Sequence, residues 1–225
     1  MEPPDSASSE ANPYVAPEAE LVTSKVGADP LRRRAAVAKW TLGSSAVAGG
    51  VYLALELFVA FGAPSPSSAA ASGAAYDQAL FVGSWLLVLT SIAARIAFMM
   101  WMHRAHVRLL ELKPRGRVTP AWAVGWWFVP FANLWKPFQI SRDLWRRSDA
   151  GSQWPKASYP AWLWIWWGSV IVGSEAPQAA VRLNSIDWSR GASWVFLAAG
   201  IAANLMTALI VVQITDAQCT LLGFE

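Results

Sequence analysis

The chain has 225 residues, of which 55% are hydrophobic and 15% charged, and its mean hydropathy is +0.31. Soluble domains carry roughly a quarter charged residues, so this composition argues against a purely soluble protein and favours a membrane protein. The net charge of +3 does not indicate a nucleic-acid partner, because the basic residues stand in short loops beside apolar segments, where they act as orientation signals.

The first 34 residues are rich in Pro, Ser, Ala and acidic side chains and show no apolar periodicity. Such a segment cannot bury enough apolar surface to offset its loss of conformational entropy, so we expect a disordered cytoplasmic tail over residues 1–34. The first apolar run begins only near residue 40, too late for a cleaved signal peptide, so we expect it to remain as an anchor. The transmembrane domain is predicted over residues 35–222.

Four segments are predicted to cross the membrane, because about 20 apolar residues are needed to span the hydrocarbon core. They are residues 40–63, 79–102, 158–176 and 192–215, of which the third is the shortest. The predicted fold is all-α, a polytopic integral membrane helical bundle. Small residues recur four apart, as at Ser45 and Gly49, and this spacing predicts close helix packing.

Between the second and third predicted spans lies the stretch TPAWAVGWWFVPFANLWKPF, which is apolar but contains three prolines. If this stretch returns to the side of the membrane from which it entered, most lysines and arginines share that side. Of the remaining basic residues, Arg182 and Arg190 lie on the other side and Arg95 lies inside a span. That asymmetry favours return over crossing. We therefore predict a Pro-broken re-entrant or interfacial element over residues 119–148, with a helix from about Pro120 to Val129.

A second helix of this element is predicted to begin near Pro137. Ile140 and Leu144 share one of its faces, and Arg142 and Arg146 share another. This pattern is typical of a helix that lies along the membrane surface with its arginines toward lipid headgroups.

The blocks WMHRAHVRLL and PAWAVGWWFVPFANLWKPF, an LW pair at Trp145 and a WW pair at Trp166 and Trp167 carry a family resemblance. Over roughly residues 40–215 the chain resembles the bacterial family of domain of unknown function 4328 (DUF4328). The chain departs from that family's pattern at residues 106–108, where an asparagine-containing stretch is common. The resemblance implies a multi-span membrane protein and supplies no chemistry.

Glu56 and Arg95 are the clearest ionisable residues inside predicted spans, and an intramembrane charge is a functional hypothesis by default. Their predicted depths differ by about 14 Å, too far for a direct ion pair. In the alternative interpretation, Arg95 extends to the inner headgroups and Glu56 is neutral or lies near the outer face.

Most tryptophans fall near the predicted inner leaflet, beside arginines. One hypothesis is an aromatic-walled pocket that binds a lipid headgroup or an amphipathic ligand; the alternative is that the rings only pack and shield the proline-broken segment. The candidate ligand or lipid residues are Arg104, Arg108, Trp126, Trp127, Asn133, Trp135, Arg142, Arg146, Trp166 and Trp167.

No pattern of catalytic residues is present: the sequence contains no phosphate-cradling glycine loop, GxSxG or HExxH. His103 and His106 lie three apart, but no carboxylate or cysteine stands at a matching spacing except Glu111, on a different part of the helix. The single Cys219 excludes a cysteine cluster. We expect no catalytic residue, no metal site and no cofactor.

The sequence thus predicts a non-enzymatic protein of the bacterial cytoplasmic membrane, with both termini in the cytoplasm. Its basic, Trp-rich inner surface is expected to bind anionic lipid, an amphipathic ligand or a partner protein, and a homo-oligomer or a partner membrane protein is a further expectation. The alternative is a small-solute transporter or carrier that uses Glu56, Arg95, Asn133 and Asn204 along a path. A membrane enzyme is the third hypothesis.

Overall fold

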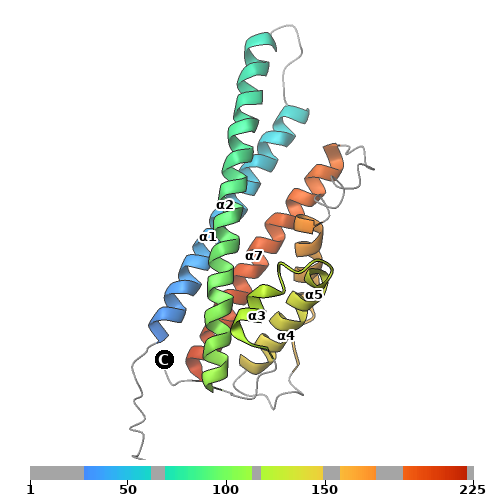
Figure 1. The fold of residues 1–225 in the computed structure, drawn as a ribbon. Coiled ribbons are helices and arrows are strands. Elements are labelled where there is room, and N and C mark those ends of the chain that lie inside the picture. Colours follow the sequence, from blue (N-terminus) through green and yellow to red (C-terminus); the bar gives the residue numbers. More distant parts are fainter. Residues whose placement is uncertain (1–27, 62–68, 113–117, 149–157, 176–189, 222–225) are drawn as a thin grey trace, which may run out of the picture.

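The computed structural model describes residues 28–61, 69–112, 118–148, 158–175 and 190–221, and every regular element within these ranges is helical (Figure 1). Helix α1 (Ala28–Phe61) begins inside the predicted tail, so assigning residues 28–34 to disorder was wrong. The reason is packing: Leu31 and Ala35 are buried and start an apolar stripe before the membrane segment. Residues 1–27 lie outside the described residues.

Three helices are long and apolar enough to cross a membrane: α1, α2 (Ala69–Leu112) and α7 (Arg190–Thr220). They confirm three of the predicted spans and are longer than predicted. Helix α2 has 44 residues and therefore measures about 66 Å, roughly twice the hydrocarbon thickness. The hydropathy pattern marks only the lipid-facing part of such a helix, because polar residues continue the same backbone beyond it.

The third predicted segment, residues 158–176, forms α5 (Trp162–Val170), continued by the π-helical turn η3 (Ile171–Glu175). Its apolar helix, Trp162–Gly173, is shorter than a span, so the described residues contain three helices of spanning length and not four. The helix begins only after Pro160, because a proline disfavours helical backbone at the residue before it. The Pro160 carbonyl then accepts a hydrogen bond from the Leu163 N–H in the first turn.

Helix α1 runs antiparallel to both α2 and α7, and hydrogen bonds between side chains fix the register. The hydroxyls of Ser45 and Ser91 lie 3.1 Å apart, and the Asn204 amide donates to the Ser45 hydroxyl at 3.2 Å. Close contact is possible because Gly49 presents no side chain to Ile201 of α7. The predicted Ser45/Gly49 packing face is therefore confirmed, with α7 as its partner.

The remaining elements are α3 (Pro120–Gly125), the single 3-10 turn η2 (Ala132–Leu134) and α4 (Lys136–Ser148). They pack beside the end of α2 and the end of α7, at the end of the bundle where α1 begins (Figure 1). We call this the basic end, because it carries most of the described basic residues. These are Arg32, Arg33, Arg34, Lys39, Arg104, Arg108, Lys136, Arg142, Arg146 and Arg147.

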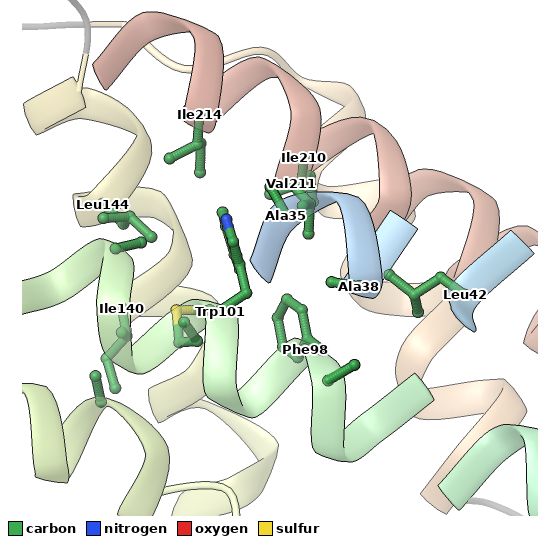
Figure 2. Close-up of a cluster of buried hydrophobic side chains, with 14 of the residues drawn as sticks. Ala35, Ala38, Leu42, Phe98, Trp101, Ile140, Leu144, Ile210, Val211 and Ile214 are labelled. Carbon is green, nitrogen blue, oxygen red and sulfur yellow. The ribbon is translucent and has the colours of Figure 1, made fainter. Parts of the chain in front are cut away.

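The hydrophobic core lies at the basic end, where α1, α2, α4 and α7 meet (Figure 2). Trp101 of α2 is fully buried at its centre, and its indole N–H donates to the Thr215 hydroxyl at 3.0 Å. Ile140 and Leu144 of α4 are also buried, which confirms that they share one face. Large apolar side chains outside this core are mostly exposed along α1 and α2, as expected for surfaces that face lipid.

Candidate functional site

The Pro-rich stretch begins as a capped helix. Thr119 accepts a hydrogen bond from the Trp122 N–H at 3.4 Å, and Pro120 occupies a first-turn position where no N–H partner is needed. The helix ends at Gly125 and not at Val129 as predicted, because the N–H groups of Trp127 and Phe128 bind carbonyls only three residues back, which tightens the chain.

Residues 126–135, which we call the elbow, reverse the chain through a tight turn. Phe131 has φ 62° and ψ −45°, and the Ala132 N–H donates to the Pro130 carbonyl at 2.7 Å, the geometry of a γ-turn with positive φ. Such a conformation strains a residue other than glycine by about 1–3 kcal/mol. The Asn133 N–H, which donates to the Val129 carbonyl at 2.9 Å, helps to hold it.

Aromatic rings cover one side of the elbow. The buried Trp167 donates its indole N–H to the Leu134 carbonyl at 3.2 Å, which satisfies a backbone group that no regular helix pairs. The Trp127 ring packs against Phe98 and Trp167, with centroids 5.5 Å and 6.0 Å away. These contacts agree with the interpretation that tryptophans pack and shield this segment.

Beside these rings lies a cavity of about 470 Å³, bounded by α1, α2, the elbow, α5, η3 and α7. Among the described residues that line it, Arg95 is the one charged side chain, so we call it the Arg95 cavity. Polar groups also line it: Ser91, Asn133, Asn204 and Thr207. Arg95 is exposed at the edge of the cavity, and the other exposed side chains there are apolar: Ile92, Ile96, Met100 and Phe128.

Trp127 lines the Arg95 cavity and carries a hydrogen-bond donor. Its indole nitrogen is buried and has no hydrogen-bond partner within the described part of the chain. A buried donor left unsatisfied costs about 1–3 kcal/mol, so a molecule with an acceptor atom would be stabilised here. Arg95 and Trp127 thus both favour an acceptor-bearing ligand.

A second cavity, also of about 470 Å³, lies between α1, α2, η3 and α7, farther from the basic end. Glu56 is the one charged residue among the described side chains that line it, and we call it the Glu56 cavity. The Tyr52 side chain hydrogen-bonds to Glu56. Trp194, at the wall of this cavity, also has a buried indole nitrogen with no partner among the described residues.

The two cavities adjoin, because Ser91, Gly173, Gly200 and Asn204 line both of them. The hydrogen-bonded group Ser45–Ser91–Asn204 stands at this junction. Gly173 and Gly200 bring η3 and α7 into backbone contact at the same level.

Glu56 and Arg95 do not meet. The Ser45–Ser91 contact fixes the level of α1 against α2. From this level, Glu56 lies along α1 away from the basic end, whereas Arg95 lies along α2 in the opposite direction, toward the basic end. At 1.5 Å per residue their depths differ by about 22 Å, more than the predicted 14 Å. The prediction that they form no direct ion pair agrees with this separation.

Three of the predicted ligand residues, Trp127, Asn133 and Trp166, line the Arg95 cavity. The others lie outside its lining: Arg104, Arg108, Trp126, Trp135, Arg142, Arg146 and Trp167. Arg142 and Arg146 instead lie over the Tyr159 ring, 5.7 Å and 4.7 Å from its centroid. Arg142 and Arg146 point away from the Arg95 cavity because the opposite, apolar face of α4 packs into the core.

Sequence reasoning missed Ser91 and Thr207 as wall residues of the cavities. The Thr207 hydroxyl accepts from the Trp166 indole at 2.8 Å and donates to the Ala203 carbonyl at 2.6 Å. An isolated polar residue in an apolar helix is a signal for such a role, but a serine or threonine can also bond its own helix, as Thr90 does with Leu86.

Among the described residues, no group of three or more His, Cys, Asp or Glu side chains is placed to hold a metal ion. Neither a search of curated proteins nor a search of solved structures found a match to this chain. The model of the domain of unknown function DUF4328 matches residues 65–216, most of the chain, and the protein therefore belongs to the DUF4328 family.

Proposed function

We propose that this protein is a non-enzymatic, integral protein of the bacterial cytoplasmic membrane that binds an anionic amphipathic molecule, a phosphorylated lipid, in the Arg95 cavity. The observation that carries the proposal is the composition of the cavity wall. Arg95 supplies the positive charge, Trp127 supplies an unsatisfied donor, and the edge around Arg95 is otherwise apolar. A guanidinium binds phosphate oxygens through charge-assisted hydrogen bonds, and the apolar edge suits acyl chains.

The position of the cavity supports a ligand that enters from the membrane. Ile92, Ile96 and Phe128 line it and are exposed on the outside of the bundle, where lipid would contact them. Counted from the Ser45–Ser91 contact, Arg95 of α2 lies only about 3 Å deeper in the membrane than Lys39 of α1. The Arg95 guanidinium therefore reaches the level of the lipid headgroups.

In the proposed orientation the basic end lies in the cytoplasm, and both termini of the chain therefore lie there too. Within it, residues 119–148 enter and leave on the cytoplasmic side. The exposed apolar side chains of the elbow, among them Phe128, Phe131 and Trp135, support contact with lipid at its tip.

A fourth crossing near residues 158–176 belongs to the same proposal. Gln218 of α7 contacts Ser148 at the basic end, whereas Trp194 of α7 contacts Phe61 at the opposite end, with ring centroids 5.5 Å apart. The chain between Ser148 and the start of α7 must therefore travel from one end to the other. Helix α5 and η3 cover part of that path.

The first test replaces Arg95 by Gln and measures, by native mass spectrometry of detergent-purified protein, the phosphatidylglycerol that is retained. Loss of a charge-assisted contact should weaken retention about 10- to 100-fold. Lys39→Gln is the matched control, because it removes a positive charge at nearly the same depth outside the cavity, and it should retain the lipid. Equal retention by the Arg95 variant, or a preference of the wild-type protein for phosphatidylcholine, would contradict the proposal.

The half-buried arginines Arg142 and Arg146 of α4 should add weaker lipid contacts at the membrane surface. At about 1 kcal/mol per basic residue, replacing Arg142 and Arg146 by Gln should weaken this surface binding roughly 30-fold, without loss of the tightly held lipid. Arg147 stays unchanged, because it is only 7% exposed and burial lowers its pKa. The readout is the number of additional phosphatidylglycerol molecules bound as lipid is titrated; an unaltered titration would refute a role for this surface.

The second candidate function is a small-solute carrier, favoured by one observation: the Arg95 and Glu56 cavities share four lining residues and follow one another in depth. A carrier would need Glu56 for movement of solute, whereas lipid binding in the Arg95 cavity would not. Glu56→Gln should then abolish uptake into proteoliposomes and leave phosphatidylglycerol retention intact.

A further inference from the structure

We propose that the Glu56 cavity is a separate binding site for an apolar amine in its cationic form. The site lies in the half of the bundle away from the basic end, and it does not depend on lipid binding in the Arg95 cavity. The proposal assigns a ligand class to a cavity in which the one charged residue among the described lining side chains is acidic.

The charge of the cavity is the first argument. Glu56 is the one charged residue among the described lining side chains, and its wall is otherwise built mainly from apolar and small residues. A carboxylate in such surroundings is costly unless a positive group accompanies it. Arg95 cannot fill that role, because it lies about 22 Å away in depth. An ammonium group of a ligand would stabilise the carboxylate directly.

The aromatic wall is the second argument. Tyr52, Trp194 and Phe196 line the cavity and come from α1 and α7, so rings stand on two sides of the space. Aromatic faces attract organic cations through their quadrupole, and the attraction grows to about 2 kcal/mol where water is excluded. A hydrated inorganic ion gains little from such walls, whereas an apolar amine contacts both the rings and the carboxylate.

The hydrogen-bonding groups refine the ligand class. The Trp194 indole N–H is buried and has no partner among the described residues, and Tyr52 already bonds Glu56. A ligand with an oxygen acceptor near its ammonium group would satisfy this donor. The volume of about 470 Å³ accommodates a molecule with one fused ring and a short side chain.

Propranolol is a suitable probe, because it is an apolar secondary amine that also carries an ether oxygen and a hydroxyl group. Its binding would be measured by equilibrium dialysis with protein in phosphatidylcholine nanodiscs, whose lipid has no net charge. The wild-type protein should bind the probe saturably. Glu56→Gln should weaken binding at least tenfold, and Trp194→Phe, which keeps a ring but removes the N–H, should weaken it severalfold.

Asp77→Asn is the matched control, since Asp77 is an exposed acid near the start of α2 and does not line the cavity. It should bind the probe as the wild-type protein does, and so should Arg95→Gln, which separates this site from the proposed lipid site. A comparison that needs no variant uses 1-naphthol, an uncharged analogue of the ring, which should bind at least tenfold more weakly. Absence of saturable binding, equal affinity of the Glu56→Gln protein, or equal binding of the uncharged analogue would each overturn the proposal.

Discussion

Replacing Gly173 by Ala should destabilise the folded protein by about 3 kcal/mol, the upper part of the usual range for an overpacked site. A Cβ at this position would lie 2.6 Å from both the Cα and the N of Gly200, closer than any tolerated contact. These are backbone atoms, so the clash can be relieved only by moving η3 away from α7. The free energy of unfolding in a dodecyl sulfate titration measures the effect.

The matched control is Gly200→Ala. A Cβ on Gly200 meets only the Gly173 carbonyl oxygen, at 3.9 Å, an ordinary contact. The same methyl group added to Gly200 of α7 should therefore change the free energy of unfolding by less than about 1 kcal/mol. If the two variants unfold at the same denaturant concentration, the close approach of η3 and α7 is wrong. The stability effect should be accompanied by weaker ligand binding, because both glycines line the two cavities.

Replacing Trp101 by Ala should destabilise the protein by about 3–5 kcal/mol, because it removes one of the two largest fully buried side chains from the centre of the core. Figure 2 shows the indole between α4 and α7, with Leu144 on one side and Ile214 on the other. Its ring also stacks on Phe98, with centroids 5.7 Å apart.

Trp40→Ala is the control for this variant, since Trp40 is 70% exposed on α1 and should contribute little to the free energy of unfolding. Thr215→Val then isolates the hydrogen bond: it keeps the shape of the side chain but leaves the Trp101 N–H without its acceptor, at a cost of about 1–3 kcal/mol. Thr90→Val, whose hydroxyl bonds only its own helix, should have a smaller effect. An equal effect of the Trp101 and Trp40 variants would contradict the position of the core.

The all-helical class, three of the spans and the family could be predicted from the sequence. Long apolar runs leave few alternatives, because in lipid each backbone N–H and C=O must be paired within its own helix. Local signals also located the element between the second and third spans: Pro120 begins a helix and Lys136, beside Pro137, begins the next. Ile140 and Leu144 share a buried face, as their spacing requires.

The candidate site was only partly predicted, because it depends on which helices lie side by side. The arginines of α4 are close in sequence to the aromatic stretch, yet the packing of Leu144 into the core turns Arg142 and Arg146 toward Tyr159. Arg95 is distant in sequence from Asn133 but lines the same cavity. Spacing along one helix determines which residues share a face, and it does not determine what that face meets.

By itself, the sequence determined that this chain forms apolar helices, that two of them begin at Pro120 and beside Pro137, and which of their residues share a face, because these properties follow from local hydropathy, proline and helical periodicity. Only the tertiary structure decided that α1 packs antiparallel to α2 and α7 through Ser45, Ser91 and Asn204. It also decided that Glu56 and Arg95 line separate cavities. Those arrangements depend on contacts between residues far apart in the chain, which no local pattern encodes.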